Sequence, residues 1–233
     1  MKKTAAVIAG LALLGAASST AQASEIIFET SPRDQRFVYF AERDYLFAEA
    51  AFPFSLLPEA FTVTDAHWWG GCYDLATTDP GSPLSGTGSQ TCPDGDFVLT
   101  FYDDAGGAPG LPIQSFNVGN ADQTATGNLI GGFITEYAYT ADFAPLVLVP
   151  LQTYWFAISN DVAGTTWGWE SAGGEGVHAQ FNQDTATWTE QNDNLAFRLT
   201  GPEPVAVPEP GMISLLAAGL GGLVLSRFRQ HRH

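Results

Sequence analysis

The chain has 233 residues, with 25 acidic and nine basic side chains and a formal net charge of −16 at pH 7. From Ser24 to Val207 it carries 24 acidic residues against four arginines, 4 − 24 = −20, and no lysine. Such a surface repels phosphate backbones and argues against nucleic acid as a partner. Its many aromatic residues argue against a disordered chain.

The first 23 residues have the three parts of a secretory signal peptide. Lys2 and Lys3 precede an uncharged apolar stretch from Ala5 to Ala17, and Ala21-Gln22-Ala23 follows as a small-x-small motif. This pattern predicts cleavage by signal peptidase before Ser24. The alternative, an N-terminal membrane anchor, needs roughly 20 apolar residues.

Residues 24–203 have the length of one domain and the pattern of short strands. In Asp96–Tyr102 the apolar Phe97, Leu99 and Phe101 alternate with residues of the opposite face, a period of two that predicts a strand. The same reading applies to Phe61–Trp69, Ile113–Val118, Gly132–Phe143, Thr153–Asn160, Thr165–Glu170, Val177–Asn182 and Asn194–Thr200.

Turn residues separate these strands, as in Asp79-Pro80-Gly81, Pro93-Asp94-Gly95 and Ala105–Gly110. Only Arg36–Ala51 contains a stretch without turn residues that is compatible with a helix. Many short strands without alternating helices predict an all-β fold, a single antiparallel β-sandwich of jelly-roll-like form, with a barrel as the alternative.

Cys72 and Cys92 are the two cysteines of the chain, and both belong to the exported part. In an oxidising compartment two such residues most simply pair, so we expect a disulfide between them. A metal site built from two isolated cysteines is the less favoured alternative.

Three aromatic groups are candidates for stacking against sugar rings. Trp167 and Trp169 share one face of a strand, and Asn160, Asp161 and Glu170 are near them in sequence as polar contacts. The alternative is that the rings fill the sandwich core. The carbohydrate-stacking candidates are Trp68, Trp69, Tyr73, Trp167, Trp169 and Trp188.

Four aspartates are weak candidates for calcium, the one cofactor left open. Asp94 and Asp96 precede a predicted strand, and Asp103 and Asp104 follow it. Loop carboxylates suit Ca²⁺, but the intervening strand separates the two pairs by roughly 20 Å, so they cannot share an ion. Neither pair matches an EF-hand, and aspartate is also an ordinary turn residue.

No catalytic motif is recognised, so the chain is expected not to be an enzyme. The body lacks His-Glu-x-x-His and Gly-x-Ser-x-Gly. A glycosidase needs two carboxylates at a set separation, which a sequence does not show, and Glu136 and Glu170 are guesses for such a pair.

The C-terminal 30 residues, 204–233, contain three ordered elements. Pro208-Glu209-Pro210 precedes an apolar run from Met212 to Leu225, and an arginine cluster follows. A helix over Gly211–Ser226 is about 24 Å long, barely enough for a hydrocarbon core of about 30 Å. The arginines favour the cytoplasmic side, which places the body outside.

These three elements together resemble the PEP-CTERM sorting signal, which in Gram-negative bacteria is recognised by exosortase, a membrane-embedded cysteine transpeptidase. The resemblance implies a sorting motif at Pro208, Glu209 and Pro210. It also implies transient anchoring in the inner membrane, transfer to the cell surface or extracellular matrix, and association with exopolysaccharide.

The body itself resembles the secreted β-sandwich domains that precede such tails. The similar segments are Phe97–Asp104, Gly107–Gly110, Tyr154–Ile158 and Trp167–Trp169. This resemblance implies a jelly-roll-like domain without shared catalytic residues. We therefore expect a non-enzymatic surface or matrix protein that binds exopolysaccharide; the alternatives are a secreted carbohydrate-active enzyme and a calcium-dependent adhesion module.

Overall fold

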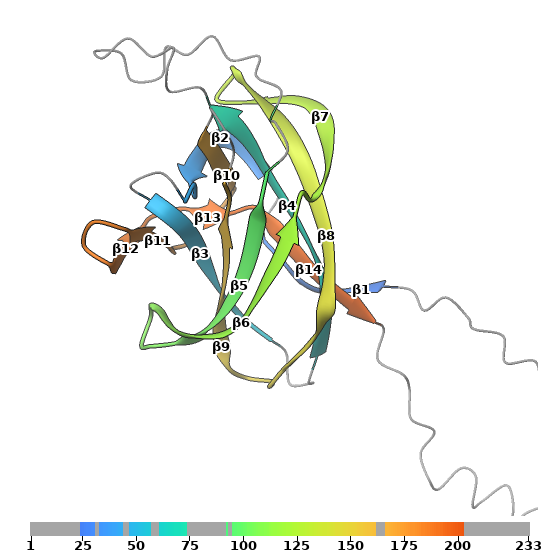
Figure 1. The fold of residues 1–233 in the computed structure, drawn as a ribbon, viewed down its shortest axis with the longest axis vertical. Coiled ribbons are helices and arrows are strands. Elements are labelled where there is room, and N and C mark those ends of the chain that lie inside the picture. Colours follow the sequence, from blue (N-terminus) through green and yellow to red (C-terminus); the bar gives the residue numbers. More distant parts are fainter. Residues whose placement is uncertain are drawn as a thin grey trace, which may run out of the picture.

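The protein is described by a computed structural model that covers residues 24–30, 33–43, 47–56, 61–73, 92, 95–161 and 166–202. The predicted signal peptide and the predicted sorting tail lie outside these ranges. Within them, the regular structure consists of fourteen strands that form two antiparallel sheets (Figure 1). The expected all-β, antiparallel sandwich is confirmed.

The first sheet is organised around β4 (Phe61–Tyr73). Along one edge β4 pairs with β8 (Ile134–Leu148), which in turn pairs with β7 (Asp122–Ile130). The other edge of β4 is shared end to end by two strands. These two strands are β14 (Phe197–Pro202) and β10 (Thr166–Ala172). On its far side β14 pairs with β1 (Ser24–Glu29), and β10 pairs with β2 (Arg33–Phe40) and β13 (Asn194–Leu195).

The second sheet has six strands, with β9 and β3 at its centre. From one edge to the other the order is β12 (Thr187–Gln191), β11 (His178–Asn182), β3 (Phe47–Ser55), β9 (Thr153–Ser159), β5 (Phe97–Asp104) and β6 (Pro109–Gly119).

Large aromatic rings fill the space between the sheets. Trp68 of the first sheet packs edge-on against Phe97 of the second, with ring centroids 5.2 Å apart. Phe156 of the second sheet contacts Trp169 at 5.8 Å in the same way. Along β5 the buried Phe97, Leu99 and Phe101 alternate with Val98 and Tyr102, which are only partly buried, so the predicted period of two sets which rings of this strand enter the core.

Two glycines of β4, Gly70 and Gly71, lie where there is no room for a side chain. A Cβ atom at Gly70 would lie 2.9 Å from the Trp167 ring, and one at Gly71 would lie 2.7 Å from the Thr135 carbonyl oxygen. Both glycines therefore follow Trp68 and Trp69 in β4 because neighbouring strands and rings approach too closely for a side chain.

The helix considered for Arg36–Ala51 is wrong. Residues 36–40 belong to β2, and residues 47–51 belong to β3. Ala50 and Phe52 of β3 are buried against the first sheet, and the strand pairs with β9 and β11 on its two sides. This tertiary pairing overrides the local helical preference of alanine and glutamate.

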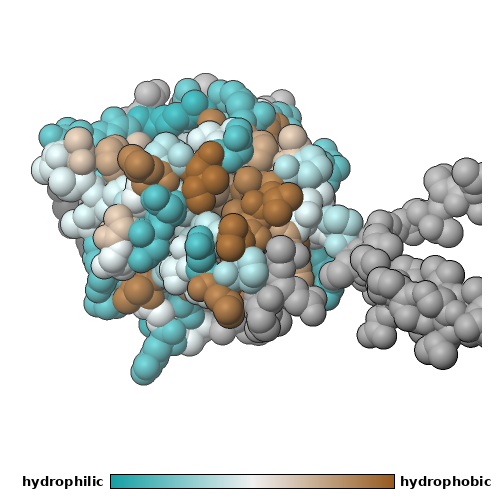
Figure 2. Space-filling model, turned by 90° about the horizontal axis from the view of Figure 1, so that it is seen from below, coloured by the Kyte–Doolittle hydropathy of each residue, from teal (hydrophilic) through white to brown (hydrophobic). Residues whose placement is uncertain are grey.

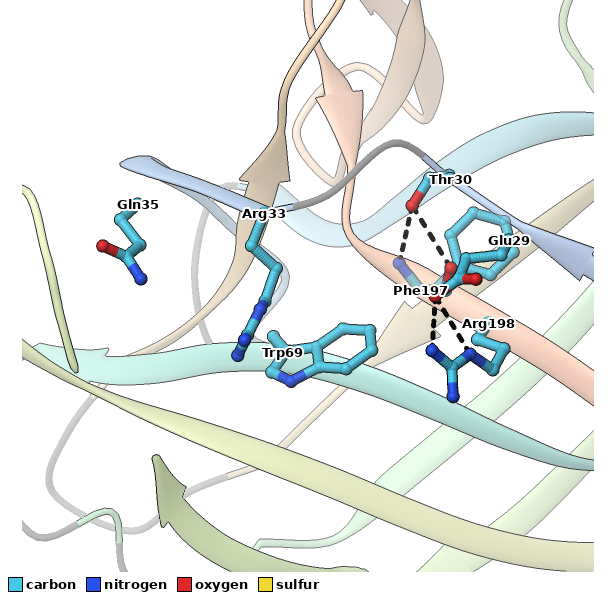
Figure 3. A pocket seen from close by; sticks show the side chains of 7 residues that line it. All are labelled: Glu29, Thr30, Arg33, Gln35, Trp69, Phe197 and Arg198. Carbon is cyan, nitrogen blue, oxygen red and sulfur yellow. Dashed lines mark hydrogen bonds and ion pairs between the residues drawn. The ribbon is translucent and has the colours of Figure 1, made fainter. Parts of the chain in front are cut away.

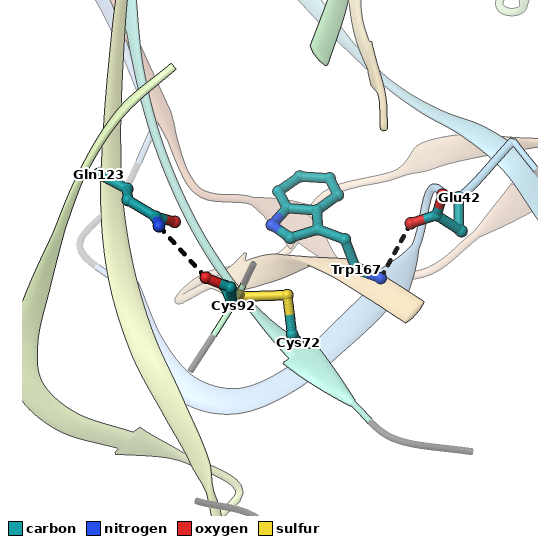
Figure 4. The surroundings of a disulfide bond; sticks show 5 residues. All are labelled: Glu42, Cys72, Cys92, Gln123 and Trp167. Carbon is teal, nitrogen blue, oxygen red and sulfur yellow. Dashed lines mark hydrogen bonds between the residues drawn. A yellow bond between two sulfur atoms is a disulfide. The ribbon is translucent and has the colours of Figure 1, made fainter. Parts of the chain in front are cut away.

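The predicted disulfide is confirmed, since Cys72 and Cys92 are joined. It links the end of β4 in the first sheet to the segment that precedes β5 in the second (Figure 4). Both cysteines are buried, and the Trp167 ring lies beside the bridge. The covalent bond thus ties the two sheets together at one end of the aromatic core.

Reducing this bond is expected to lower stability without changing the fold. The bridge closes a loop with a sequence separation of 20, which in the chain-entropy model is worth about 3 kcal/mol. Urea unfolding of the double variant Cys72→Ser/Cys92→Ser, compared with the oxidised protein, measures this loss. Equal midpoints and slopes would contradict the expected contribution.

Candidate functional site

A pocket of about 350 Å³ opens on the outer face of the first sheet. Strands β1, β2, β4 and β14, or the residues that directly follow them, supply its walls. Figure 3 shows the indole of Trp69 between the side chains of Arg33 and Arg198. The complete lining consists of Glu29, Thr30, Arg33, Gln35, Trp69, Phe197 and Arg198.

The alternation of β4 places Trp69 in this pocket. Trp68 points into the core and has no exposed surface, so its neighbour Trp69 points outward and is only partly buried. The guanidinium carbon of Arg33 lies 5.0 Å from the centre of the Trp69 ring, within the range of a cation–π contact. The pocket therefore contains one accessible aromatic ring held between cationic and polar side chains.

An irregularity of β2 brings Arg33 and Gln35 to the pocket. The register between β2 and β10 shifts between Glu170 and Ala172 of β10, and Ser171 in the gap donates from its hydroxyl to Asp34 at 2.6 Å. Gln35 has a φ of 56°, the left-handed region that is unfavourable for a residue with a Cβ atom. Bulges of this kind re-aim side chains, and strained residues concentrate at functional sites.

Two fully buried carboxylates lie behind the pocket, Glu136 from β8 and Glu170 from β10. Arg33 forms an ion pair with Oε1 of Glu136, and the amide of Asn128 donates to the same oxygen at 3.4 Å. The backbone N–H of Gln35 donates to Oε1 of Glu170 at 3.2 Å. The Oε2 atoms of both glutamates are buried without a hydrogen-bond partner in the structure described here.

The electrostatic balance of this cluster depends on the proton of Glu170. Burial first, and then the neighbouring Glu136 carboxylate, raise the pKa of Glu170 from 4.5 to about 8, although Arg33 and the Gln35 N–H oppose the shift. Near neutral pH Glu170 is therefore mostly protonated, and the ion pair of this cluster is the one between Arg33 and Glu136.

Arg198 and Glu29 form the opposite wall of the pocket. The Nε atom of Arg198 donates to Oε1 of Glu29 at 3.0 Å, and Nη2 donates to the same oxygen at 2.5 Å. Thr30, the next residue after β1, exchanges hydrogen bonds with the backbone of Phe197. These contacts fasten β1 and its end to β14 and give this wall a defined shape.

Three of the six aromatic residues predicted to stack against sugars are core residues instead, and a fourth is nearly buried. Trp68, Trp167 and Trp169 have no exposed surface, and Tyr73 is 4% exposed. The expectation that Trp167 and Trp169 share one face is confirmed, but that face is the inner one, where Trp169 donates its indole N–H to the Ala196 carbonyl oxygen at 2.8 Å. Buried rings present no face to a ligand, so stacking by Trp68, Trp167 and Trp169 is wrong. Tyr73 belongs to a separate apolar cluster with Ile130 and Ile134 and lines a second pocket of about 290 Å³, so its role in stacking stays a prediction.

Trp188 lies on β12, an edge strand of the second sheet, whereas Trp69 lies on the first sheet. It is partly buried and packs edge-on against Tyr102 and Phe181, at 5.6 and 5.3 Å between ring centres. The Tyr102 hydroxyl donates to both carboxylate oxygens of Glu49, at 3.1 and 2.9 Å. Burial raises the pKa of Glu49 to about 7, against the opposing effect of this hydrogen bond.

The three calcium candidates that the structure describes serve as local structural anchors. Asp96 pairs with Arg43 at 3.0 Å, and Asp103 accepts a hydrogen bond from the backbone of Leu111. Asp104 accepts from the Trp155 indole at 2.9 Å and from the N–H groups of the following glycine turn, and these bonds lower its pKa. As expected, the strand β5 separates Asp96 from Asp104; Asp94 lies outside the described residues.

Within the described ranges, no three histidine, cysteine, aspartate or glutamate side chains are grouped to hold a metal ion. The same ranges contain no helix long and apolar enough to cross a bilayer. The predicted sorting motif, Pro208, Glu209 and Pro210, lies outside them.

Comparisons with protein-family models, with curated proteins and with solved structures found no match.

The buried Glu170 predicts a fall in stability with rising pH. Its folded pKa of about 8 lies above the ordinary value of 4.5, so the folded state keeps a proton that the unfolded state releases within that window. The free energy of unfolding should therefore decrease between about pH 4.5 and 8. Glu170→Gln should match the wild type at low pH and exceed its stability at pH 8 by about 4 kcal/mol, since one pKa unit corresponds to about 1.4 kcal/mol.

Glu49→Gln is the matched control for that measurement, made by chemical unfolding at a series of pH values. Its effect should be complete by about pH 7, because the pKa of Glu49 is raised only to about 7. Stability curves of wild type and Glu170→Gln that run parallel from pH 4.5 to 8 would exclude a protonated Glu170 in the folded state.

Proposed function

We propose that the protein is an exported, non-enzymatic module of the cell surface or extracellular matrix that binds a saccharide in the pocket around Trp69. Exosortase handles its C-terminal tail, and the ligand belongs to the extracellular polysaccharide. The jelly-roll-like assignment, the signal peptide and the C-terminal sorting helix are parts of the same proposal.

The observation that carries the proposal is the composition of the pocket. A partly exposed indole offers a flat apolar surface to the C–H groups of a sugar ring, and polar side chains surround it. Arg198, Glu29, Thr30 and Gln35 supply donors and acceptors at the rim for sugar hydroxyls. The volume of about 350 Å³ suits one or two sugar units, near the lower end of ligand-binding pockets.

The charges of the pocket are compatible with a neutral or acidic saccharide, in contrast to the acidic surface around it. Two of the four arginines of the body line it, in a body with a formal charge of −20. With Glu170 protonated, Arg33 and Arg198 are balanced by Glu136 and Glu29. The pocket is thus close to neutral. An acidic sugar is therefore not repelled by the pocket, although the rest of the acidic surface repels anions, and a neutral sugar is repelled by neither.

A glycoside hydrolase on the same scaffold is the second candidate. Glu136 and Glu170 lie in one cluster, and the raised pKa of Glu170 resembles that of a general acid. Both carboxylates are fully buried, however, and Arg33 occupies Glu136. A carboxylate that acts on a glycosidic bond must reach it, so the geometry favours binding over hydrolysis.

Replacing Trp69 is expected to weaken polysaccharide binding about tenfold, or ~1.4 kcal/mol. The Trp69→Ala variant removes the stacking surface but takes little from the core, because this ring lies on the outer face. Affinity electrophoresis in gels containing the exopolysaccharide of the producing host measures the change in binding.

Trp188→Ala is the matched control, since it also removes a partly buried indole but from the second sheet. It should migrate like the wild type in the polysaccharide gel. Retardation that is equal for wild type and Trp69→Ala, at unchanged melting temperature, would place any saccharide site elsewhere. Release of reducing sugar that Glu170→Gln abolishes would favour the hydrolase.

The sorting part of the proposal is tested by the intact mass of the protein isolated from its host, with and without exosortase. We expect a mature chain that begins at Ser24 and ends near Pro210, or carries an added group there. A chain that retains Met212–His233 in the presence of the enzyme would contradict sorting and leave the binding proposal standing.

A further inference from the structure

Exposed apolar side chains gather at the end of the sandwich where β1 begins and β14 ends. We name this set the apolar end surface. Figure 2 views that end and shows hydrophobic surface gathered across it. Its large members are Ile26, Leu111, Ile113, Val147, Val149 and Leu151.

The strand register places this surface next to the exit of the chain. Val147 of β8 pairs with Thr62 near the start of β4, and Gly201 of β14 lies against the opposite side of Thr62. Two strand spacings separate Val147 from Gly201, which corresponds to about 10 Å. Ser24 of β1 pairs with Pro202, so both ends of the domain leave at the same place.

The tip of this surface is the end of β8 with the turn that leads to β9, where Val147, Val149 and Leu151 are 68%, 54% and 75% exposed. The stretch from Phe143 to Asn160 contains no charged residue and no histidine, although the body is rich in aspartate and glutamate. An uncharged apolar projection on a strongly acidic protein marks an interaction surface.

The turn is held in shape rather than loosely exposed. The hydroxyl of Tyr154, whose ring is buried, accepts from the Val149 N–H at 2.9 Å and donates toward the Val149 carbonyl at 3.2 Å and the Gln152 side chain at 3.1 Å. Leu151 has a φ of 61°, which costs a residue with a Cβ atom on the order of 1 kcal/mol. The fold therefore accepts strain at a position where an apolar side chain points into solvent.

We infer that the apolar end surface docks onto the interfacial region of the lipid bilayer while the C-terminal apolar run is in the membrane. This inference rests on the proposed function, because the run from Met212 to Leu225 supplies the anchor. Nine residues connect Pro202 to Met212 and span at most about 30 Å, so the exit end is the part of the domain held nearest the bilayer. Uncharged apolar side chains enter that interface favourably, and an acidic surface does not.

The test uses the full chain with a nitroxide label, reconstituted in phosphatidylcholine vesicles. Val149→Cys carries the label at the turn, and Leu129→Cys on β7 carries it at the opposite end of the sandwich, where Leu129 is 47% exposed. Electron paramagnetic resonance measures collisions of each label with oxygen and with an aqueous nickel chelate. We expect the oxygen-to-nickel ratio at residue 149 to be several-fold higher than at residue 129.

Three outcomes would overturn docking to lipid. A label at residue 149 as accessible to nickel as the label at 129, on chains that sediment with alkali-washed vesicles, would refute docking but leave the anchor. Chains that fail to sediment would refute anchor and docking together. Spin–spin broadening at residue 149 that disappears on dilution with unlabelled chain would show that a second copy covers the surface.

Leu151→Asn separates docking from folding. Asparagine tolerates the left-handed conformation better than leucine, so the variant should unfold at the same or a higher denaturant concentration. It should nevertheless lower the oxygen-to-nickel ratio at residue 149. Loss of stability without a change in that ratio would assign Leu151 a structural role and overturn its role in docking.

Discussion

The packing of indole rings against glycine backbone is the constraint on which the structure depends. Trp68 of β4 and Trp167 and Trp169 of β10 lie in the core. Gly70 of β4 pairs with Trp169, and a side chain there would collide with the Trp167 ring. The absence of a side chain at Gly70 leaves room for the Trp167 ring of the neighbouring strand β10. Because the ring must lie on the inner face, it also fixes which residues of β4 and β10 face outward. The position of Trp69 in the pocket is therefore a consequence of the position of Trp68 in the core.

The sequence predicts the strands well where one face is buried and the alternation is unbroken. Phe97, Leu99 and Phe101 show this pattern, and β5 follows it. Prediction fails for β2 and β3, because β2 is interrupted by an irregularity at Gln35 and β3 contains alanine and glutamate that also suit a helix. Only pairing with distant strands decides these segments, and a local pattern contains no information on that pairing.

The candidate site is less predictable than the fold. The pattern Trp68-Trp69 requires one ring on each face of a strand, but the sequence does not say which face is the core. Arg33, Glu136 and Glu170 come from three strands of the first sheet and meet only through the pairing of β10 with β2 and of β4 with β8 and β10. The only sign of the buried cluster in the sequence is that Glu136 and Glu170 lie in strands that also contain aromatic residues. This combination is common in proteins, so it is a weak signal for a site.

The pairing of β14 with both β1 and β4 has a mechanical consequence. Arg198 of the pocket and Pro202 at the end of the domain lie on the same strand, four residues apart. In a tethered protein, tension between a polymer held in the pocket and the tether would pass from the pocket strands, β4 with Trp69 among them, into β14, and leave the second sheet unloaded. The hydrogen bonds of β14 to antiparallel neighbours on its two sides would then be sheared together rather than opened one by one.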